Sequence, residues 1–410
     1  MYLVVGYAVP KVIKGRRARA LKQPGRGKMN FELTGEQQLL VESVRRFVNE
    51  RVKPNARAWD RSETFPTEVV GELAEMGLLG VMVGEEYGGA GLGSMEMALV
   101  IEEIAKGDGS LALTVASHNG LCSSHIRMFG TDEQRREFLP DLASGAKLGA
   151  WALTEPNSGS DAGGMLTTAV REGDDWVLNG SKIFITQGTV GGTYVVLAST
   201  DKSKGNHGIT AFIVDGDAPG FGKQPLKEKL GMRSSDTAVL TFDQVRVPDS
   251  CRLGEIGCGF VNTLQILDRG RITIGALSVG LGAGALEAAR DYALVREQFG
   301  RPIAKFQAIQ WKLADMSTEL DAARLLVHRA AFLCEKGRPF TKEASMGKLF
   351  ASEAAMRATD QSIQIHGGYG YTAEFPVERL YRDAKLCTIG EGTSEVQRLV
   401  IARQVLSEVG

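Results

Sequence analysis

Residues 151–161 read WALTEPNSGSD, and the hydrophobic pattern of the chain changes at this point. Before this stretch, apolar residues recur with the 3.6-residue period of an α-helix, and after it they alternate with the two-residue period of a β-strand. The helical period returns from Phe260 onward. This order predicts a helical part, a small all-β part and a second helical part, each with its own core.

The middle part contains several short runs rich in Val, Ile, Thr and aromatic residues, which favour strands. The dipeptide Asn179-Gly180 is typical of a two-residue hairpin turn, so we expect one strand to end there and the next to begin. Many short strands separated by Gly and Asp indicate an antiparallel barrel or sandwich. The expected strands are residues 176–178, 182–186, 194–198, 209–214 and 238–242.

The helical parts carry their own signals. Thr34 with Gln37, and Thr131 with Gln134, have the spacing of a capping box, which predicts a helix start at each place. From residue 313 to residue 334, apolar residues recur at alternating spacings of three and four, which is typical of the seam of a helix bundle. Leu325 and Leu326 give this helix a second apolar face, so we expect it to be covered on several sides, within one bundle or by another subunit.

Composition excludes several classes of protein. The chain has 410 residues, of which 43% are hydrophobic and 24% charged, and a formal net charge of −1, so neither nucleic acid nor an anionic membrane is an expected partner. We expect no apolar run long enough to cross a bilayer. Five cysteines without a CxxC pair and five histidines without metal-ligand spacing predict neither disulfides nor a metal site, which fits a reducing compartment.

Residues 1–28 contain basic side chains and no acid, and we expect them to be a disordered extension. One interpretation is an organelle-targeting peptide, which would place the protein in the mitochondrial matrix. Met29, which is followed at once by the capped helix, favours an over-long reading frame instead, and a bacterial protein of this kind would be cytoplasmic.

A second informative stretch is IGEGTSEVQR at residues 389–398. Gly390 and Gly392 allow the backbone beside Glu391 to approach a ligand closely, and Thr393 or Ser394 can cap a following helix. Taken alone, these ten residues favour an ordinary helix entry in which Glu391 is a solvated acid of the first turn.

Five stretches together resemble, in order, the motifs of the acyl-CoA dehydrogenase family, and the resemblance covers nearly everything after Met29. They are WALTEPNSGSD (151–161), GSKIFIT (180–186), REQFGRPIAKFQAIQ (296–310), QIHGGYGY (364–371) and IGEGTSEVQR (389–398). The chain is similar to the short-chain and branched-chain members. The resemblance implies an α-helical N-terminal domain (29–148), a small antiparallel β-barrel or sandwich (149–256) and a C-terminal four-helix bundle (257–410).

The resemblance also implies an activity: FAD-dependent oxidation of an acyl-CoA thioester to the trans-2-enoyl-CoA, within fatty acid or branched-chain amino acid catabolism. Glu391 would remove the α proton while a hydride goes to flavin N5. Some members carry the glutamate at the position of Gly270, and glycine cannot accept a proton, so Glu391 is the matching base and Arg271 shapes its site. The implied partners are electron-transfer flavoprotein and further copies of the chain in a homotetramer, a dimer of dimers.

The family's contacts are carried over residue by residue. Arg296 and Phe299 resemble the pair that reaches a flavin bound mainly by the partner subunit, and Phe184 stands where tryptophan is usual. His366 is interpreted as a structural loop residue rather than an acid or base. The implied FAD contacts are Leu153, Thr154, Ser158, Gly159, Phe184, Ile185, Thr186, Arg296, Phe299, Gln307, Gln364, Ile365, His366, Gly367, Gly368, Thr393 and Glu395. The implied substrate contacts are Ser160, Asp236, Thr237, Asp268, Arg271 and Gly392.

Two alternatives stay open at this point. The same fold serves acyl-CoA oxidases, which pass electrons to oxygen, and it could also serve a non-catalytic scaffold that binds flavin and CoA. Acyl-chain length is not readable from the sequence, because the shape of the pocket depends on packing. Gly390 stands where a bulky tyrosine is common in the family, so the shape of the acyl cavity also stays open.

Overall fold

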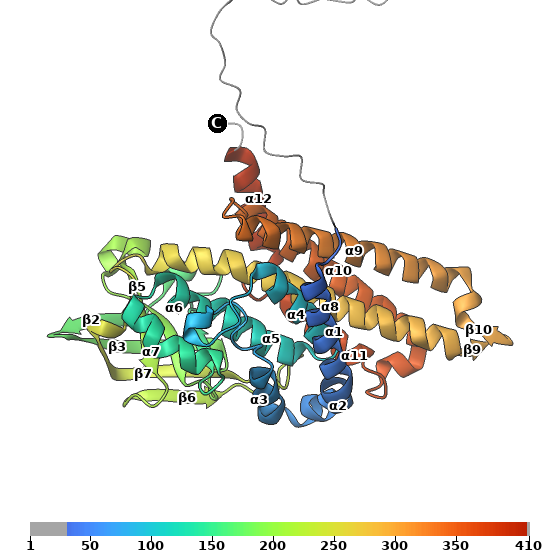
Figure 1. Ribbon diagram of the computed structural model, residues 1–410, viewed down its shortest axis with the longest axis horizontal. Coiled ribbons are helices and arrows are strands. Elements are labelled where there is room, and N and C mark those ends of the chain that lie inside the picture. The colour runs from blue at the N-terminus through green and yellow to red at the C-terminus, as the bar shows by residue number, and fades with distance from the viewer. Residues whose placement is uncertain (1–30, 408–410) are drawn as a thin grey trace, which may run out of the picture.

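The computed structural model describes residues 31–407, whose helices and strands follow one another in three groups (Figure 1). The predicted three-part fold is confirmed. The first group is α1 (Gly35–Phe47), α2 (Lys53–Ser62), α3 (Thr67–Glu75), α4 (Ser94–Ala105), α5 (Gly109–Ser117), α6 (Ser124–Phe129) and α7 (Asp132–Ala143). The second is β1 (Gly149–Ala152), β2 (Thr168–Glu172), β3 (Asp175–Thr186), β4 (Thr193–Ser199), β5 (Ile209–Asp215), β6 (Phe221–Pro225), β7 (Thr237–Pro248) and β8 (Arg252–Leu253).

The third group forms the bundle and carries a small hairpin. It comprises α8 (Gly259–Val295), β9 (Glu297–Gln298), β10 (Arg301–Pro302), α9 (Gln307–Glu335), α10 (Thr341–His366), α11 (Val377–Cys387) and α12 (Ser394–Ser407). The exact domain boundaries stay a prediction. The basic segment 1–28, which we expect to be disordered, lies outside the described residues.

Both predicted capping boxes are present. The Thr34 hydroxyl accepts from the backbone N–H of Gln37 at 3.2 Å, and the Gln37 side chain accepts from the backbone N–H of Thr34 at 3.0 Å. Thr131 and Gln134 repeat the arrangement at the start of α7. Each box supplies partners for backbone donors that a helix start leaves unpaired, which explains why two local signals located these helices correctly.

The sheet is mostly antiparallel, in the order β6-β7-β3-β2-β4-β5-β8, with parallel pairing of β4 to both β1 and β2. The predicted hairpin turn at Asn179-Gly180 is wrong, because β3 runs through both residues and the dipeptide forms an irregularity in its pairing with β7. Asn179 accepts from the backbone N–H of Gln244 at 3.0 Å, and a Cβ on Gly180 would lie 2.7 Å from Cα of Thr167. Tertiary pairing therefore overrides the local turn preference.

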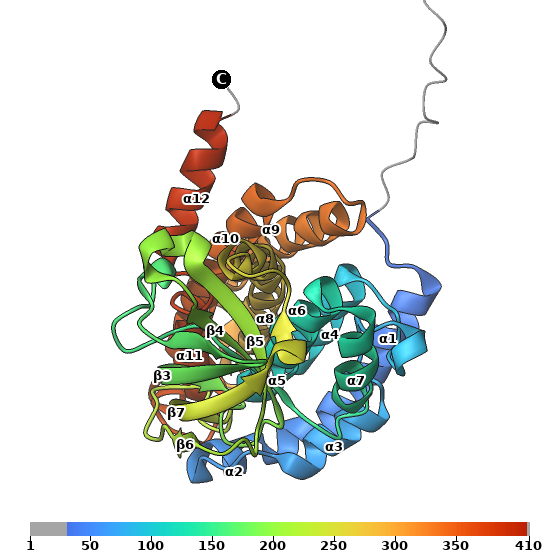
Figure 2. The same cartoon turned by 90° about the vertical axis from the view of Figure 1, so that its left-hand side faces the viewer.

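Helix α8 is the central helix of the molecule. It has 37 residues and packs against α4, α5, α9, α10 and α11, and Figure 2 shows it between the N-terminal helices and the sheet. By length and composition it could span a membrane, so the expectation that no apolar run is long enough was wrong. Within the protein, 83% of an apolar 18-residue stretch of this helix is buried, which identifies α8 as a core helix.

Glycines on α8 let other helices approach its backbone. A Cβ on Gly280 would overlap the backbone carbonyl oxygen of Glu102 on α4, and a Cβ on Gly282 would overlap the side chain of Leu320 on α9. Because interiors are packed to crystal density, these contacts leave no room for a methyl group. The α9 seam predicted from the sequence is buried against this surface, whereas Leu325 is 52% exposed.

We therefore expect Gly280→Ala to lower the free energy of unfolding by about 1–3 kcal/mol, because the atom that the methyl group meets is backbone and cannot turn away. Thermal unfolding followed by circular dichroism measures the effect. The matched control is Gly71→Ala in α3, where nothing lies within 4 Å. That change should be neutral or stabilising by about 0.5–1 kcal/mol, since alanine is the better helix former. Equal destabilisation by both changes would contradict the packing argument.

Candidate active site

Glu391 lies in the turn between α11 and α12, in the left-handed region at φ 54°, with Gly392 beside it at φ 94°. Thr393 caps α12, since its hydroxyl accepts from the backbone N–H of Val396 at 3.3 Å. The carboxylate atom Oε2 of Glu391 is buried and has no hydrogen-bond partner within residues 31–407. Glu391 is therefore not the solvated first-turn acid that the local sequence favoured.

The space beside this carboxylate comes from α8. A Cβ on Gly270 would overlap Oε2 of Glu391 and would lie 3.3 Å from the side chain of Leu121. The two positions that the sequence comparison treated as alternative sites for the base are thus neighbours in space. A side chain at position 270 and the present position of Glu391 exclude each other.

The charge of Glu391 depends on opposing effects. Burial raises the pKa of its carboxyl to about 7, while the cations Lys348 and Arg271 act in the opposite direction. Arg271 is itself buried on α8, and it donates to Oδ1 of Asp268 at 2.6 Å and to the hydroxyl of Ser345 at 3.2 Å. The result is a carboxyl group that changes charge near neutral pH.

Two residues that hold this turn were not predicted from the sequence. Lys348 Nζ donates to the carbonyl oxygen of Gly392 at 2.7 Å, and Gln397 Nε2 donates to the same oxygen at 3.0 Å. Both side chains are fully buried. A signal for Lys348 was available, because it lies on the small apolar face of α10 with Ala344 and Ala351, where a charged residue is unusual.

A buried ion pair holds the loop that follows β1 in place. Lys182 Nζ lies 2.8 Å from Oε1 of Glu155, with side-chain exposures of 0% and 2%, and it also donates to the Leu153 carbonyl at 3.0 Å. Ser158 donates its hydroxyl to the Asp161 carbonyl at 2.6 Å. Of the predicted contacts, Gly159 and Ser160 are exposed on this loop and Thr154 is half-buried.

Three predicted residues lie at the end of β3, and two of them have side chains that solvent can reach. Phe184 has φ 61° and is 62% exposed, and Thr186 is half-buried. The side chain of Ile185 is buried in the core, so only its backbone is available to a ligand. Thr237 pairs directly with Thr186 across the sheet, while the carboxylate of Asp236 accepts from the N–H of Thr189 at 2.7 Å and so supports a turn.

A second group of predicted residues lines a cleft of about 720 Å³ between the β9–β10 hairpin and the end of α10. Within the described chain, Arg296 has no acidic partner, and its guanidinium lies 5.7 Å from the ring of Tyr369. His366 Nδ1 lies 2.8 Å from the carbonyl oxygen of Ser362, Nε2 is buried without a partner, and burial lowers the pKa of the ring. The predicted residues in this cleft are Arg296, Phe299, Ile365, His366, Gly367 and Gly368; Gln307 and Gln364 are exposed and do not line it.

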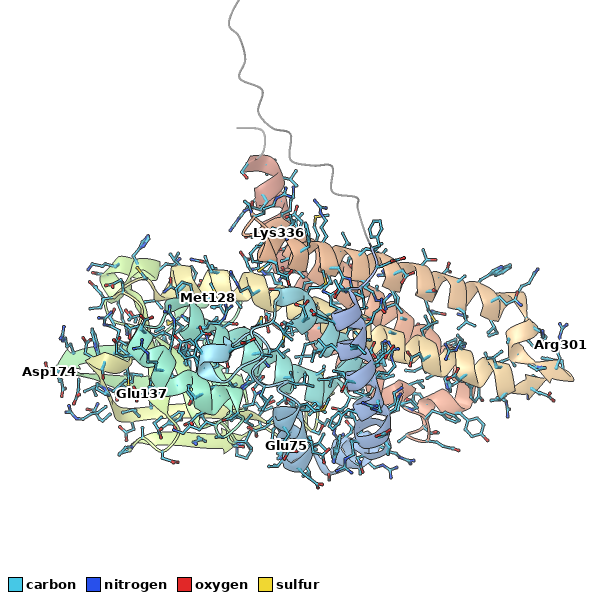
Figure 3. All side chains as sticks on the ribbon, viewed as in Figure 1. Glu75, Met128, Glu137, Asp174, Arg301 and Lys336 are labelled. Atoms are coloured by element: carbon cyan, nitrogen blue, oxygen red, sulfur yellow. The ribbon has the colours of Figure 1, made fainter. Side chains whose placement is uncertain are left out.

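Glu391 and the cleft that contains Arg296 lie far apart in one chain. Figure 3 shows Arg301, on the hairpin, and Asp174, at the edge of the sheet, at opposite ends of the molecule. Gly270 and Val295 are 25 residues apart on α8, which is about 38 Å at 1.5 Å per residue. The cleft with Arg296 is therefore remote from Glu391 of the same chain.

Comparisons with known proteins agree along the chain. Three family models match in order: "Acyl-CoA dehydrogenase, N-terminal domain" over residues 34–146, "middle domain" over 150–245 and "C-terminal domain" over 257–406. The "Probable acyl-CoA dehydrogenase YngJ" of Bacillus subtilis is 50% identical over 379 residues, which cover 92% of this chain and 100% of that protein.

Two solved structures are also similar. The butyryl-CoA dehydrogenase of Megasphaera elsdenii is 44% identical with a TM-score of 0.90, covering 92% of this chain and 100% of that chain. A chain in a structure of the electron transferring flavoprotein of Acidaminococcus fermentans is 44% identical with a TM-score of 0.91 and the same coverage.

The buried ion pair gives a testable consequence. Replacing Glu155 by glutamine leaves Lys182 buried without its counter-charge, so we expect Glu155→Gln to cost about 3–5 kcal/mol of folding free energy. Thermal unfolding measures the loss. The control is Glu172→Gln, which breaks the exposed pair with Arg246 and should cost about 1 kcal/mol or less. Similar losses in both variants would show that burial does not decide the effect.

Proposed function

Since the chain belongs to the acyl-CoA dehydrogenase family, we propose that it oxidises the Cα–Cβ bond of a short-chain acyl-CoA thioester to the trans-2-enoyl-CoA, with FAD as cofactor. The observation that carries this proposal is the buried, unpartnered Oε2 of Glu391, whose carboxyl pKa is raised to about 7. The similarity to a butyryl-CoA dehydrogenase supports a short acyl chain.

Glu391 would act as the base. A C–H bond beside a thioester is a very weak acid, and a carboxylate in a dry site is a stronger base than one in water, because burial disfavours its charged form. Glu391 accepts the α proton at Oε2, which no group within residues 31–407 occupies. The charges of Lys348 and Arg271 keep a useful fraction of the carboxyl ionised at neutral pH.

The same turn also offers a donor for the thioester oxygen. In the described structure, the backbone N–H of Glu391 takes part in no hydrogen bond. We propose that it donates to the thioester carbonyl oxygen, where negative charge develops as the α proton leaves. A donor already in place stabilises that charge without reorganisation in the transition state. Base and donor then belong to one residue.

The residues present fit FAD at both ends of the molecule. A diphosphate suits the unpaired guanidinium of Arg296, and the open space at Gly367 and Gly368 allows the backbone to come close to a ligand. An aromatic ring system suits the exposed Phe184 and the hydroxyl of Thr186. When bound, FAD supplies the acceptor for the hydride from Cβ.

We further propose that each FAD contacts two copies of the chain, because the Arg296 cleft and Glu391, which lies beside Gly270, are about 38 Å apart along α8 of a single copy. The exposed apolar residues Trp311, Leu325 and Phe332 on α9 offer a surface for further copies, as in a dimer of dimers. The similarity to a chain in an electron transferring flavoprotein structure supports electron-transfer flavoprotein as the electron acceptor. The relative in Bacillus subtilis supports a cytoplasmic protein.

We expect Glu391→Gln to keep FAD and substrate binding, because size and polarity are preserved, yet to reduce the rate of flavin reduction by butyryl-CoA by several orders of magnitude, because an amide cannot accept the proton. Stopped-flow absorbance of the purified, flavin-loaded protein measures the rate. The control is Glu353→Gln, which removes an acid paired with Arg398 on α12 and should reduce flavin at the wild-type rate. Fast flavin reduction by Glu391→Gln would rule out Glu391 as the base, whereas a wild-type protein that binds butyryl-CoA without reducing its flavin would favour the scaffold.

The rate of flavin reduction should also depend on pH. Glu391 accepts a proton only when ionised, so with a pKa of about 7 the rate at limiting substrate should be half-maximal near pH 7 and fall about tenfold per pH unit below it. A carboxyl with an ordinary pKa of about 4.3 would give a flat rate between pH 5.5 and 8.5. A flat profile in that range would contradict the raised pKa.

A further inference from the structure

Lys348 is a buried lysine without an acidic partner in hydrogen-bond contact. Its side chain is fully buried, and its one hydrogen bond joins Nζ to the carbonyl oxygen of Gly392 at 2.7 Å. No carboxylate of residues 31–407 forms an ion pair with it. An ammonium group in such a place costs free energy unless nearby groups compensate for its charge.

Close packing keeps Lys348 in this position. A Cβ on Gly275 of α8 would lie 2.8 Å from Cγ2 of Val327 on α9 and 3.6 Å from the backbone nitrogen of Lys348 on α10. The three helices therefore meet closely where Gly275 has no side chain, which fixes the backbone of α10 at Lys348 against α8. Its ammonium group is directed at the turn that follows α11.

The groups that face Lys348 come from each element packed around it. They are Cys387 on α11, Glu391 in the turn, Arg271 on α8 and Glu395 at the start of α12. Arg271 is paired with Asp268, and Glu395 is exposed to solvent. Burial raises the pKa of the Cys387 thiol to about 11, so that thiol is neutral. Glu391 is the buried negative charge that Lys348 can stabilise.

The turn itself needs support. Glu391 is held at φ 54°, a left-handed conformation that is unfavourable for a residue with a side chain. The Gly392 carbonyl oxygen accepts from both Lys348 and Gln397, and Gln397 Nε2 also lies 3.3 Å from the carbonyl oxygen of Glu391. These buried donors fix the orientation of the peptide groups on which the carboxylate and the free N–H of Glu391 depend.

We propose that Lys348 is a positioning residue for the reaction: it holds the Gly392 carbonyl so that Glu391 keeps its left-handed conformation, and its charge stabilises the ionised form of the Glu391 carboxylate. This inference rests on the proposed role of Glu391 as base. Burial lowers the pKa of Lys348 to about 8, so the ammonium form predominates at pH 7. Lys348 thus offsets part of the rise in the pKa of Glu391 that burial causes.

Four variants of the flavin-loaded protein separate the two roles. Lys348→Met removes charge and donor, Lys348→Gln keeps an N–H donor without the charge, and Lys348→Arg keeps the charge. The control is Lys106→Met, which removes a largely buried lysine paired with Glu103, far from the turn. Infrared difference spectroscopy of the Glu391 carboxyl band, assigned with Glu391→Gln, measures its pKa without turnover. Stopped-flow flavin reduction by butyryl-CoA between pH 6 and 9 measures the rate.

We expect the pKa of Glu391 to rise by about one unit or more in Lys348→Met and Lys348→Gln, and to be unchanged in Lys348→Arg and Lys106→Met. A rise of one unit lowers the ionised fraction at pH 7 from about one half to about one tenth, so the rate there should fall about fivefold. The rate of Lys348→Gln should recover at pH 9. Lys348→Met should stay slow at pH 9, because its turn is no longer held.

A wild-type pKa of Glu391 in both charge-removing variants would overturn the proposal. So would failure of both to fold while Lys106→Met folds, because Lys348 would then have a purely structural role. If Glu391→Gln reduces flavin at the wild-type rate, the proposed function itself is wrong. If Glu391→Gln is inactive and Lys348→Met keeps the wild-type pH profile, only the inference about Lys348 fails.

Discussion

Close contact between α8 and its neighbours, made possible by glycine, is the constraint on which the rest of the structure depends. At Gly280 the backbone of α4 lies against α8, at Gly282 the side chain of Leu320 does, and at Gly270 the carboxylate of Glu391 does. Each contact uses the volume that a Cβ would occupy. One glycine-rich helix thus positions the N-terminal helices, the bundle and the carboxylate of Glu391 together.

Two buried carboxylates show how contact distance decides charge. Glu155 touches Lys182 at 2.8 Å, and that ammonium group holds the pKa of Glu155 below its usual range despite burial. Glu391 has cations nearby but none in hydrogen-bond contact, so burial prevails and its pKa rises. The first arrangement gives an ion pair that fixes a loop, and the second gives a carboxyl group that can gain and lose a proton near pH 7.

The length of α8 has a further consequence. It carries the β9–β10 hairpin, beside which the Arg296 cleft lies, to one end of the molecule, while the sheet lies toward the other (Figure 1). A rigid helix cannot fold back to bring the two together, so a ligand that needs both surfaces must find them on two copies. In the proposed assembly, a second copy of the chain would complete the site.

The sequence alone determined the features that depend on neighbouring residues. The change of period near residue 151 and the capping boxes at Thr34 and Thr131 are local signals. They indicated the three-part fold and located two helix starts. The motif around Glu391 indicated the family, although its local pattern favoured a solvated acid. Only the tertiary structure showed that Asn179-Gly180 lies within one strand, and that Lys348 holds a turn 44 residues away in sequence. These features arise from contacts between segments distant in the chain, and no local pattern records which segments will meet.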